Sequence, residues 1–523
     1  MTIRSTTHGL TAVFACSLLA CGGGGSKGAS APSREAQSVL PTKITPGIEI
    51  VGDAPEGVAE SARRIFSLAS RARHLTPKSP VKLETLAPEA LITVVKKHVD
   101  TEVPPEEIHA EGHVLVGLGL VPADYDFEAE TYALLKEQLA GLYIPENATM
   151  YLSKSVPADE VESTLAHELV HALQDQYFGL GAKMKFRKSA SDELSALSTL
   201  AEGDATVAMF DEMILAKGGE RALEHQDTSQ VDDVDAWKFL DATGDKAGMT
   251  KLANAPRFIA LDLVAPYADG MTFVNSLRRR GGWRAVDAAW SRPPSSTEQL
   301  LHLDKYFANE PAIAVPPATS AALGAGWKRT WDDVVGEQEA RLAFSIWMSP
   351  RAAVGAADGW GGDRATLFEA DGGKIAVAWS MVFDDEANAK EAQEALVGGW
   401  TSTFGAPQRF DKPFDVVAFG LPAPAPANDA KGKDGKAARP KESKGALPAL
   451  PDRHDEAAPA PSTSGLPALP APAGDGTSAP AKATAVLKGC RATARNGRVV
   501  AIVTTPVCDA TVAWATEVAK IAP

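Results

Sequence analysis

The chain contains a pair of histidines four residues apart, His167 and His171, with Glu168 beside the first. The surrounding stretch predicts a helix, because leucines recur every four residues and no proline or glycine interrupts the pattern until Gly179. Residues four apart lie on one helix face, so both imidazoles can reach one metal ion. This pattern predicts a Zn²⁺ site, with Glu168 as general base; a surface helix with two solvated histidines is the alternative.

A catalytic zinc site has three protein ligands, so the third must come from elsewhere in the chain. The position six residues after the second histidine is Tyr177, so a third histidine at that spacing is absent. The stretch 191–215 predicts a long helix, in which Glu202 is a carboxylate on a face of small residues. Such a carboxylate would be poorly solvated unless it met a cation. We therefore expect Glu202 to be the third ligand, with Glu193 as the alternative.

Two segments together resemble a known enzyme group. The stretch from His167 to Asp175, followed by Glu202-Gly203-Asp204-Ala205, is similar to the gluzincin group of zinc metallopeptidases. It is more similar still to bacterial exported proteins with a His-Glu-Leu-x-His-Ala-Leu-Gln-Asp-Gln helix and a later Glu-Gly-x-Ala helix. The resemblance covers roughly residues 140–210. It implies a zincin-like fold and a zinc site formed by His167, His171 and Glu202, with Glu168 as base.

The resemblance implies metal-assisted hydrolysis of peptide bonds, with a peptide or protein as substrate. Thr206 stands where thermolysin-like enzymes have an aspartate that supports the first histidine, so Asp175 and Asp204 are the candidates for that supporting role. A residue must also stabilise the oxyanion, and His225 and Tyr267 are both candidates. Two other functions stay open: a non-catalytic lipoprotein that binds peptides or partner proteins, and a zinc hydrolase acting on a non-peptide bond.

The N-terminus predicts export and lipid anchoring. Residues 1–20 combine Arg4 with an apolar run too short to span a bilayer, which is typical of a signal peptide. The run ends in Leu-Leu-Ala before Cys21, which resembles a bacterial lipoprotein signal in which this cysteine carries the lipid. An ordinary cleaved signal peptide is the alternative. A Gly-rich disordered tether is expected over residues 21–45, and the implied location is the bacterial cell envelope, on the outer membrane or facing the periplasm.

The rest of the chain predicts an α+β protein in two folded parts. The first, 46–335, is expected to be a mainly helical zincin-like domain with a small edge sheet. The second, 336–420 and 483–523, is expected to be a smaller α+β domain with an antiparallel sheet. A Pro/Ala-rich stretch, 421–482, interrupts it and is expected to be disordered.

Three further expectations concern pairing and partners. Residues 141–153 predict a β-hairpin just before the histidine helix, which either pairs with extended substrate or merely packs on the helix. Cys490 and Cys508 are expected to form a disulfide in an exported protein, with two free thiols as the alternative. The net charge of −15 and the lack of a basic cluster make nucleic acid an unexpected partner.

Overall fold

A computed structural model of the chain describes residues 47–231, 234–244, 250–422 and 489–521. The expected signal peptide, Cys21, the tether and nearly all of the insertion at 421–482 lie outside these ranges. Within them, no helix is both long enough and apolar enough to cross a bilayer.

The first part of the chain contains a four-stranded mixed sheet in the order β1-β2-β4-β3. Its strands are β1 (Ile48–Val51), β2 (Val81–Leu86), β3 (Gly141–Ile144) and β4 (Thr149–Ser153). Strands β1, β2 and β4 run parallel, and β3 pairs antiparallel with β4 at the edge. The expected hairpin is therefore confirmed, with a short 3₁₀ turn at Pro145–Asn147 between its strands.

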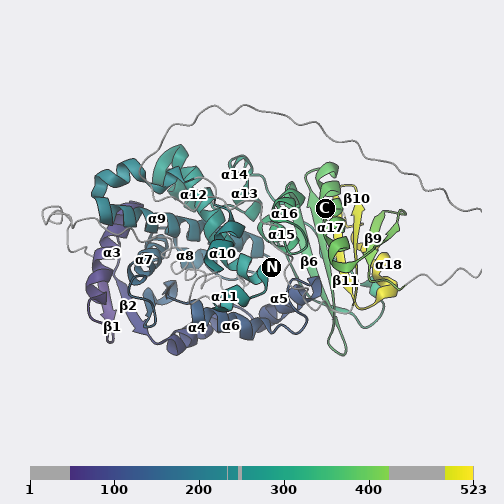
Figure 1. Cartoon of the computed structure of the whole chain (residues 1–523), viewed down its shortest axis with the longest axis horizontal. Helices are drawn as coiled ribbons and strands as arrows, with labels where there is room; N and C mark the ends of the chain where they lie inside the picture. The colour runs from purple at the N-terminus through teal and green to yellow at the C-terminus, as the bar shows by residue number, and fades with distance from the viewer. Residues whose placement is uncertain (1–46, 232–233, 245–249, 423–488, 522–523) are drawn as a thin grey trace, which may run out of the picture. The chain divides into compact units, whose positions relative to one another are not determined.

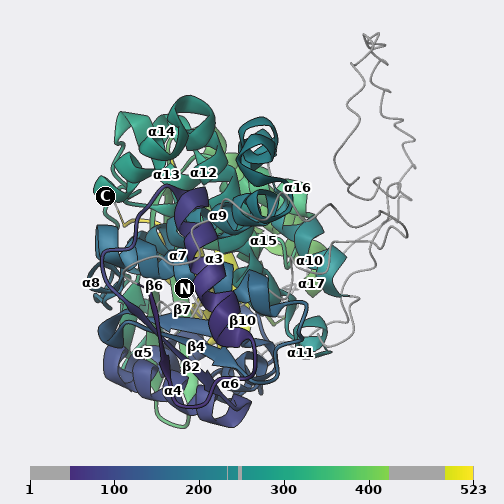
Figure 2. The same cartoon turned by 90° about the vertical axis from the view of Figure 1, so that its left-hand side faces the viewer.

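Helices make up most of this part. They are α3 (Val58–Arg73), α4 (Pro88–Glu102), α5 (Pro105–Leu118), α6 (Phe127–Gln138), α7 (Val161–Phe178), α8 (Leu180–Met184), α9 (Ser191–Gln226), α10 (Ala236–Gly244), α11 (Thr250–Asn254), α12 (Arg257–Ser291), α13 (Thr297–Leu301) and α14 (Leu303–Ala308). Helix α3 packs against both α7 and α9, as Figure 2 shows, and α9 has its most extensive helix contact with α12.

Two of these helices change direction at glycines. Helix α9 bends at Gly219, which adopts a left-handed conformation with φ of 69°, and α12 bends at Gly281 and Gly282. A left-handed φ is open to glycine at little steric cost, so the chain can turn there and resume a helix. The long helix expected over residues 191–215 extends further in the structure and continues to Gln226.

The last part of the chain forms a seven-stranded, fully antiparallel sheet in the order β5-β6-β7-β11-β10-β9-β8 (Figure 1). Its strands are β5 (Lys328–Asp333), β6 (Trp360–Ala370), β7 (Lys374–Phe383), β8 (Gln408–Phe410), β9 (Asp415–Phe419), β10 (Cys490–Asn496) and β11 (Val499–Thr505). The helices of this part are α15 (Glu337–Phe344), α16 (Pro350–Ala357), α17 (Glu386–Phe404) and α18 (Thr511–Val518). Trp400 of α17 packs on one face of the sheet and Trp514 of α18 on the other. The mixed α+β class is confirmed.

The structure bears on two expectations about this part. A disulfide joins Cys490, at the start of β10, to Cys508. The antiparallel sheet already includes β5, which lies before the expected domain boundary at residue 336. The division into two domains stays a prediction.

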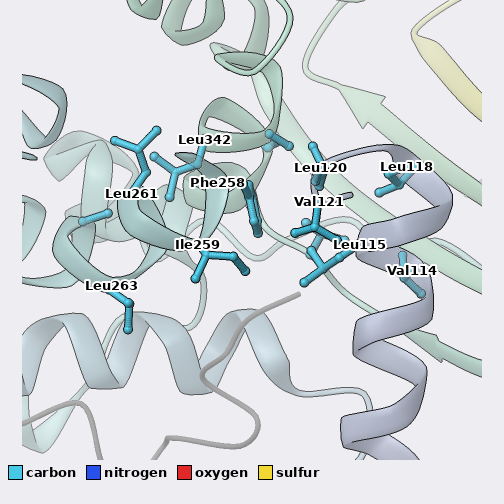
Figure 3. Packing of buried hydrophobic residues seen from close by; sticks show 14 of the residues in the cluster. Val114, Leu115, Leu118, Leu120, Val121, Phe258, Ile259, Leu261, Leu263 and Leu342 are labelled. Atoms are coloured by element: carbon cyan, nitrogen blue, oxygen red, sulfur yellow. The ribbon is translucent and has the colours of Figure 1, made fainter. Parts of the chain in front are cut away.

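One apolar cluster contains side chains from both parts of the chain. In Figure 3, Phe258 and Ile259 of α12 face Leu115 of α5 and the residues that follow that helix, Leu120 and Val121. The same cluster includes Leu342 of α15 and the buried apolar side chains of β6 and β7 on the sheet face that packs against Trp400. Helix α5 is therefore packed between α12 and the seven-stranded sheet.

Candidate metal centre

Helix α7 carries both histidines, and its own packing fixes their direction. Leu165, Leu169 and Leu173 are fully buried in an apolar cluster with α3 and the four-stranded sheet. The helix ends at Gly179, whose left-handed conformation lets its N–H bond to the Asp175 carbonyl. The helix expected from the leucine spacing is confirmed.

The side chains of His167, His171 and Glu202 converge on one point. His167 Nε2 lies 3.1 Å from Glu202 Oε2 and 3.1 Å from His171 Nε2, and the third separation, between His171 Nε2 and Glu202 Oε2, is 3.7 Å. Zinc bonds of about 2.0–2.1 Å in tetrahedral geometry place ligand atoms about 3.3 Å apart. The three ligand atoms therefore stand at the spacing that a tetrahedral zinc ion requires, with a fourth position left over.

The alternative third ligand does not reach this point. Glu193 lies at the start of α9, is exposed, and forms an ion pair with Arg187 at 2.9 Å. Glu202 lies more than two turns further along the same helix and is buried. Of these two glutamates, only Glu202 lies beside the histidine pair.

Gln174 fixes the orientation of His171, and the sequence analysis missed this role. Its Oε1 lies 2.8 Å from His171 Nδ1, and its Nε2 donates to the Ala201 carbonyl at 3.0 Å. Because the amide oxygen can only accept, His171 Nδ1 carries a proton, which leaves Nε2 as the nitrogen that can bind a metal once it is deprotonated. The signal was available: Gln174 follows His171 by three residues, on the same helix face.

Glu168 is held by the edge strand with one oxygen left over. The Tyr143 N–H of β3 donates to its Oε2 at 2.9 Å, whereas its buried Oε1 has no hydrogen-bond partner. Burial raises the pKa of the Glu168 carboxyl to about 8, against an opposing effect of His171. A dication nearby would favour the ionised form, so the carboxylate fits the role of a proton acceptor beside a metal.

Electrostatics set the ligands' protonation states without a metal. Burial alone would lower the pKa of the His171 imidazole, but the Glu202 carboxylate outweighs it and raises that pKa. Burial likewise opposes ionisation of Glu202, and the two histidines overcome it and lower its pKa. For His167, burial dominates and lowers the pKa. The cluster therefore carries a proton that an incoming metal must displace.

Two expected supporting residues are placed elsewhere. Asp204 accepts hydrogen bonds from Arg73, at 2.5 and 3.1 Å, and from the Trp290 indole at 2.7 Å. Asp175 accepts from the Tyr143 hydroxyl at 3.3 Å and the Gly181 N–H at 3.0 Å. Neither bonds to a ligand histidine, so the prediction that one of them supports His167 is wrong. Each carboxylate instead accepts from donors on other elements of the fold.

Of the two oxyanion candidates, one lies near the site. The ring of Tyr267, on α12, is 6.0 Å from that of His167, and the side chain is buried. His225 lies beyond the bend of α9 and is exposed. None of the interactions recorded for the described residues links His225 to the centre.

The centre is enclosed. His167 and Glu168 are 0% exposed, Glu202 is 2% exposed and His171 is 3% exposed. The strand β3, expected to pair with extended substrate, is at the sheet edge, but all four of its residues are buried. In this conformation the centre is shielded from solvent.

Comparison with known proteins adds one partial match. The model of DUF8575, a domain of unknown function, matches residues 325–418, which include β5, β6, β7 and α17 and do not include the metal centre. No curated protein and no solved structure matches the chain.

Proposed function

We propose that this chain is a zinc-dependent peptidase of the gluzincin type, with a zincin-like fold around α7 and α9. One observation carries the proposal: the ligand atoms of His167, His171 and Glu202 converge at zinc spacing, with a glutamate beside them that has a free oxygen. The donor set fits the ion, since two imidazoles and a carboxylate leave one position for water.

The chain's own residues divide the work as follows. A zinc ion in the site supplies a Lewis acid that makes a water more acidic and polarises the scissile carbonyl. Glu168 takes up a proton on Oε1 from the attacking water as the water oxygen bonds to the scissile carbonyl carbon, while the Tyr143 N–H holds the other carboxyl oxygen in place. Glu168 then passes this proton to the leaving amine as the C–N bond breaks. Gln174 keeps His171 in the tautomer that offers Nε2 to the metal.

The enclosed centre favours one alternative. A peptidase-like fold that only binds peptides or partner proteins needs no open path to the zinc ligands, which are at most 3% exposed here. In this alternative the metal has a structural role and the chain does not cleave its ligand. The intact Glu168, with its unpartnered oxygen, argues against it.

We further propose that the protein is held at the bacterial cell envelope by a lipid on Cys21. This rests on the sequence of the first 25 residues, in which a short apolar run, a cysteine and a glycine run follow one another. Metabolic labelling with a fatty acid, lost in Cys21→Ala, tests it; unchanged labelling of the variant excludes this anchor.

The activity test compares the protein with Glu168→Gln on a library of peptides. The amide keeps the size of the side chain and cannot take up the proton, so cleavage should fall by at least ~100-fold, while zinc is retained. Equal cleavage by both proteins would assign the activity to a contaminant or to another site. Retained zinc without cleavage by either protein would leave the binding alternative.

A further inference from the structure

A second pair of histidines with helical spacing lies far from the centre in sequence. His109 and His113 are four residues apart on α5, and their rings stand 4.0 Å from each other. As in α7, this spacing directs two imidazoles to the same side of the helix. The sequence analysis did not use this pair.

A carboxylate from the seven-stranded sheet completes the group. Glu369, near the end of β6, places Oε1 at 2.6 Å from His113 Nδ1 and 3.6 Å from His109 Nε2. Side chains alternate along a strand, so Glu369 shares a face with Leu367, which packs in the same cluster as α5. The 2.6 Å separation between His113 Nδ1 and Glu369 Oε1 must lengthen by less than 1 Å to reach the ~3.3 Å between ligand atoms of a tetrahedral zinc site.

Two contacts fix α5 on the sheet that carries the third ligand. Before the histidines, Glu107 Oε2 accepts a 2.6 Å hydrogen bond from the Trp331 indole of β5. After them, Gly117 approaches β7 so closely that a Cβ there would lie 2.5 Å from Val377 Cγ2. The backbone that presents the histidines is therefore held on both sides, which is the preorganisation that a metal site needs.

We propose that His109, His113 and Glu369 form a second, surface metal site for a borderline divalent ion such as Zn²⁺. Two imidazoles and one carboxylate suit Zn²⁺ and its first-row neighbours rather than Ca²⁺ or Mg²⁺. The side chains are 63%, 32% and 27% exposed, so an ion and its remaining waters can reach the group from solvent. A bound ion would be coordinated by side chains of both α5 and β6, and would therefore stabilise the folded state.

The test is a zinc titration of the metal-stripped full-length protein, carrying no histidine tag, followed by calorimetry. The double variant His109→Ala/His113→Ala should bind one equivalent fewer than the parent. Its melting temperature should also rise less when Zn²⁺ is added. His74→Asn is the matched control, because His74 is exposed, belongs to neither cluster, and has a left-handed φ that Asn tolerates.

The two sites report separately in this titration. Glu202→Gln should remove the buried equivalent and leave the surface one, so failure of the proposed peptidase centre does not hide the second site. An unchanged number of equivalents in the double variant, with the metal-free protein still folded, would overturn the surface site. So would a parent protein whose bound zinc all disappears in Glu202→Gln.

Discussion

Gly203 and Gly270 bring α9 and α12 into backbone contact one residue away from Glu202, the proposed third metal ligand. A Cβ built on Gly203 would lie 2.1 Å from the carbonyl carbon of Gly270, and one built on Gly270 would lie 2.2 Å from the Thr199 oxygen. No side chain larger than hydrogen fits there without separating the helices. The depth at which Glu202 enters the centre therefore depends on these two glycines.

The first prediction follows from this contact. Gly203→Ala should destabilise the protein by about 3 kcal/mol or more, because the added methyl group overpacks two backbones that cannot both relax. Zinc affinity should fall with stability, since Glu202 moves with the helix. Chemical unfolding and zinc titration of the variant measure both effects.

The matched control is Gly398→Ala on α17. A Cβ at Gly398 meets no atom within 4 Å, so alanine should be neutral or stabilise the helix by about 0.5–1 kcal/mol. Equal losses of stability in the two variants would show that the contact between α9 and α12 does not require glycine at position 203.

The second prediction concerns the support of His171. Gln174→Met keeps the length of the side chain and removes the acceptor for Nδ1–H, so zinc affinity should drop about 10–100-fold. Gln176→Met, on the same helix, is the control, because Gln176 bonds to the backbone of Lys78 and Ser79 rather than to a ligand. Competition with a chromophoric chelator gives both affinities; indistinguishable values would remove Gln174 from the centre.

The third prediction asks whether the ion pair of Arg73 and Asp204 stabilises the fold or orients a histidine of the metal centre. Arg73 and Asp204 are both 0% exposed, and the Arg73 guanidinium also packs on the Trp283 ring at 4.4 Å. Asp204→Ala should cost about 3–5 kcal/mol, because it leaves a buried guanidinium without its main partner. Asp287→Ala should cost less, because that carboxylate is 39% exposed.

Zinc stoichiometry distinguishes the two roles of Asp204, stabilising the fold or orienting a zinc ligand. The folded fraction of Asp204→Ala should still bind zinc at the buried centre, since Asp204 touches neither ligand histidine. Loss of that zinc at conditions where the variant is folded would return Asp204 to the metal-supporting role expected from the sequence.

The fourth prediction is a pH dependence of stability. Burial raises the pKa of the Glu212 carboxyl to about 7, with Arg64 opposing the shift and Glu162 adding to it, and its Oε1 has no partner. The folded state holds this proton more tightly than the unfolded chain, whose value is near 4.5. The contribution of protonated Glu212 to the free energy of unfolding is therefore full below pH 4.5 and is lost as the pH rises through about 7.

Glu212→Gln should remove this loss. The variant should gain roughly 2–3 kcal/mol over the parent above pH 7, and little below pH 4.5. Glu224 is an exposed residue on the same helix, so Glu224→Gln should leave the free energy of unfolding unchanged both above pH 7 and below pH 4.5. Urea unfolding across this range provides the measurement, and parallel curves for Glu212→Gln and the parent would contradict it.

Local periodicity was enough to predict the parts of the site that lie within one element. The spacing of Leu165, Leu169 and Leu173 predicted α7, and the small residues around Glu202 lie where α12 makes its closest approach to α9. The hairpin β3–β4 followed from two short β-type runs around a turn.

The missed features depend on pairing between distant residues. The Tyr143 N–H reaches Glu168 only because β3 is an edge strand against α7, and Arg73 meets Asp204 across 131 positions of sequence. No periodicity encodes such meetings. The same reason explains the wrong expectation for Asp175 and Asp204: their chemistry suits a supporting role, but their nearest donors come from other elements.

The zinc content of the buried centre tests the proposed metal site most directly. We would measure it by elemental analysis in a His113→Ala background, so that the surface group does not contribute, and compare Glu202→Gln with Glu193→Gln. The proposed site of His167, His171 and Glu202 predicts about one zinc per chain in the background and in Glu193→Gln, and none in Glu202→Gln. Zinc retained in Glu202→Gln, or absent from the background protein after incubation with the metal, would contradict it.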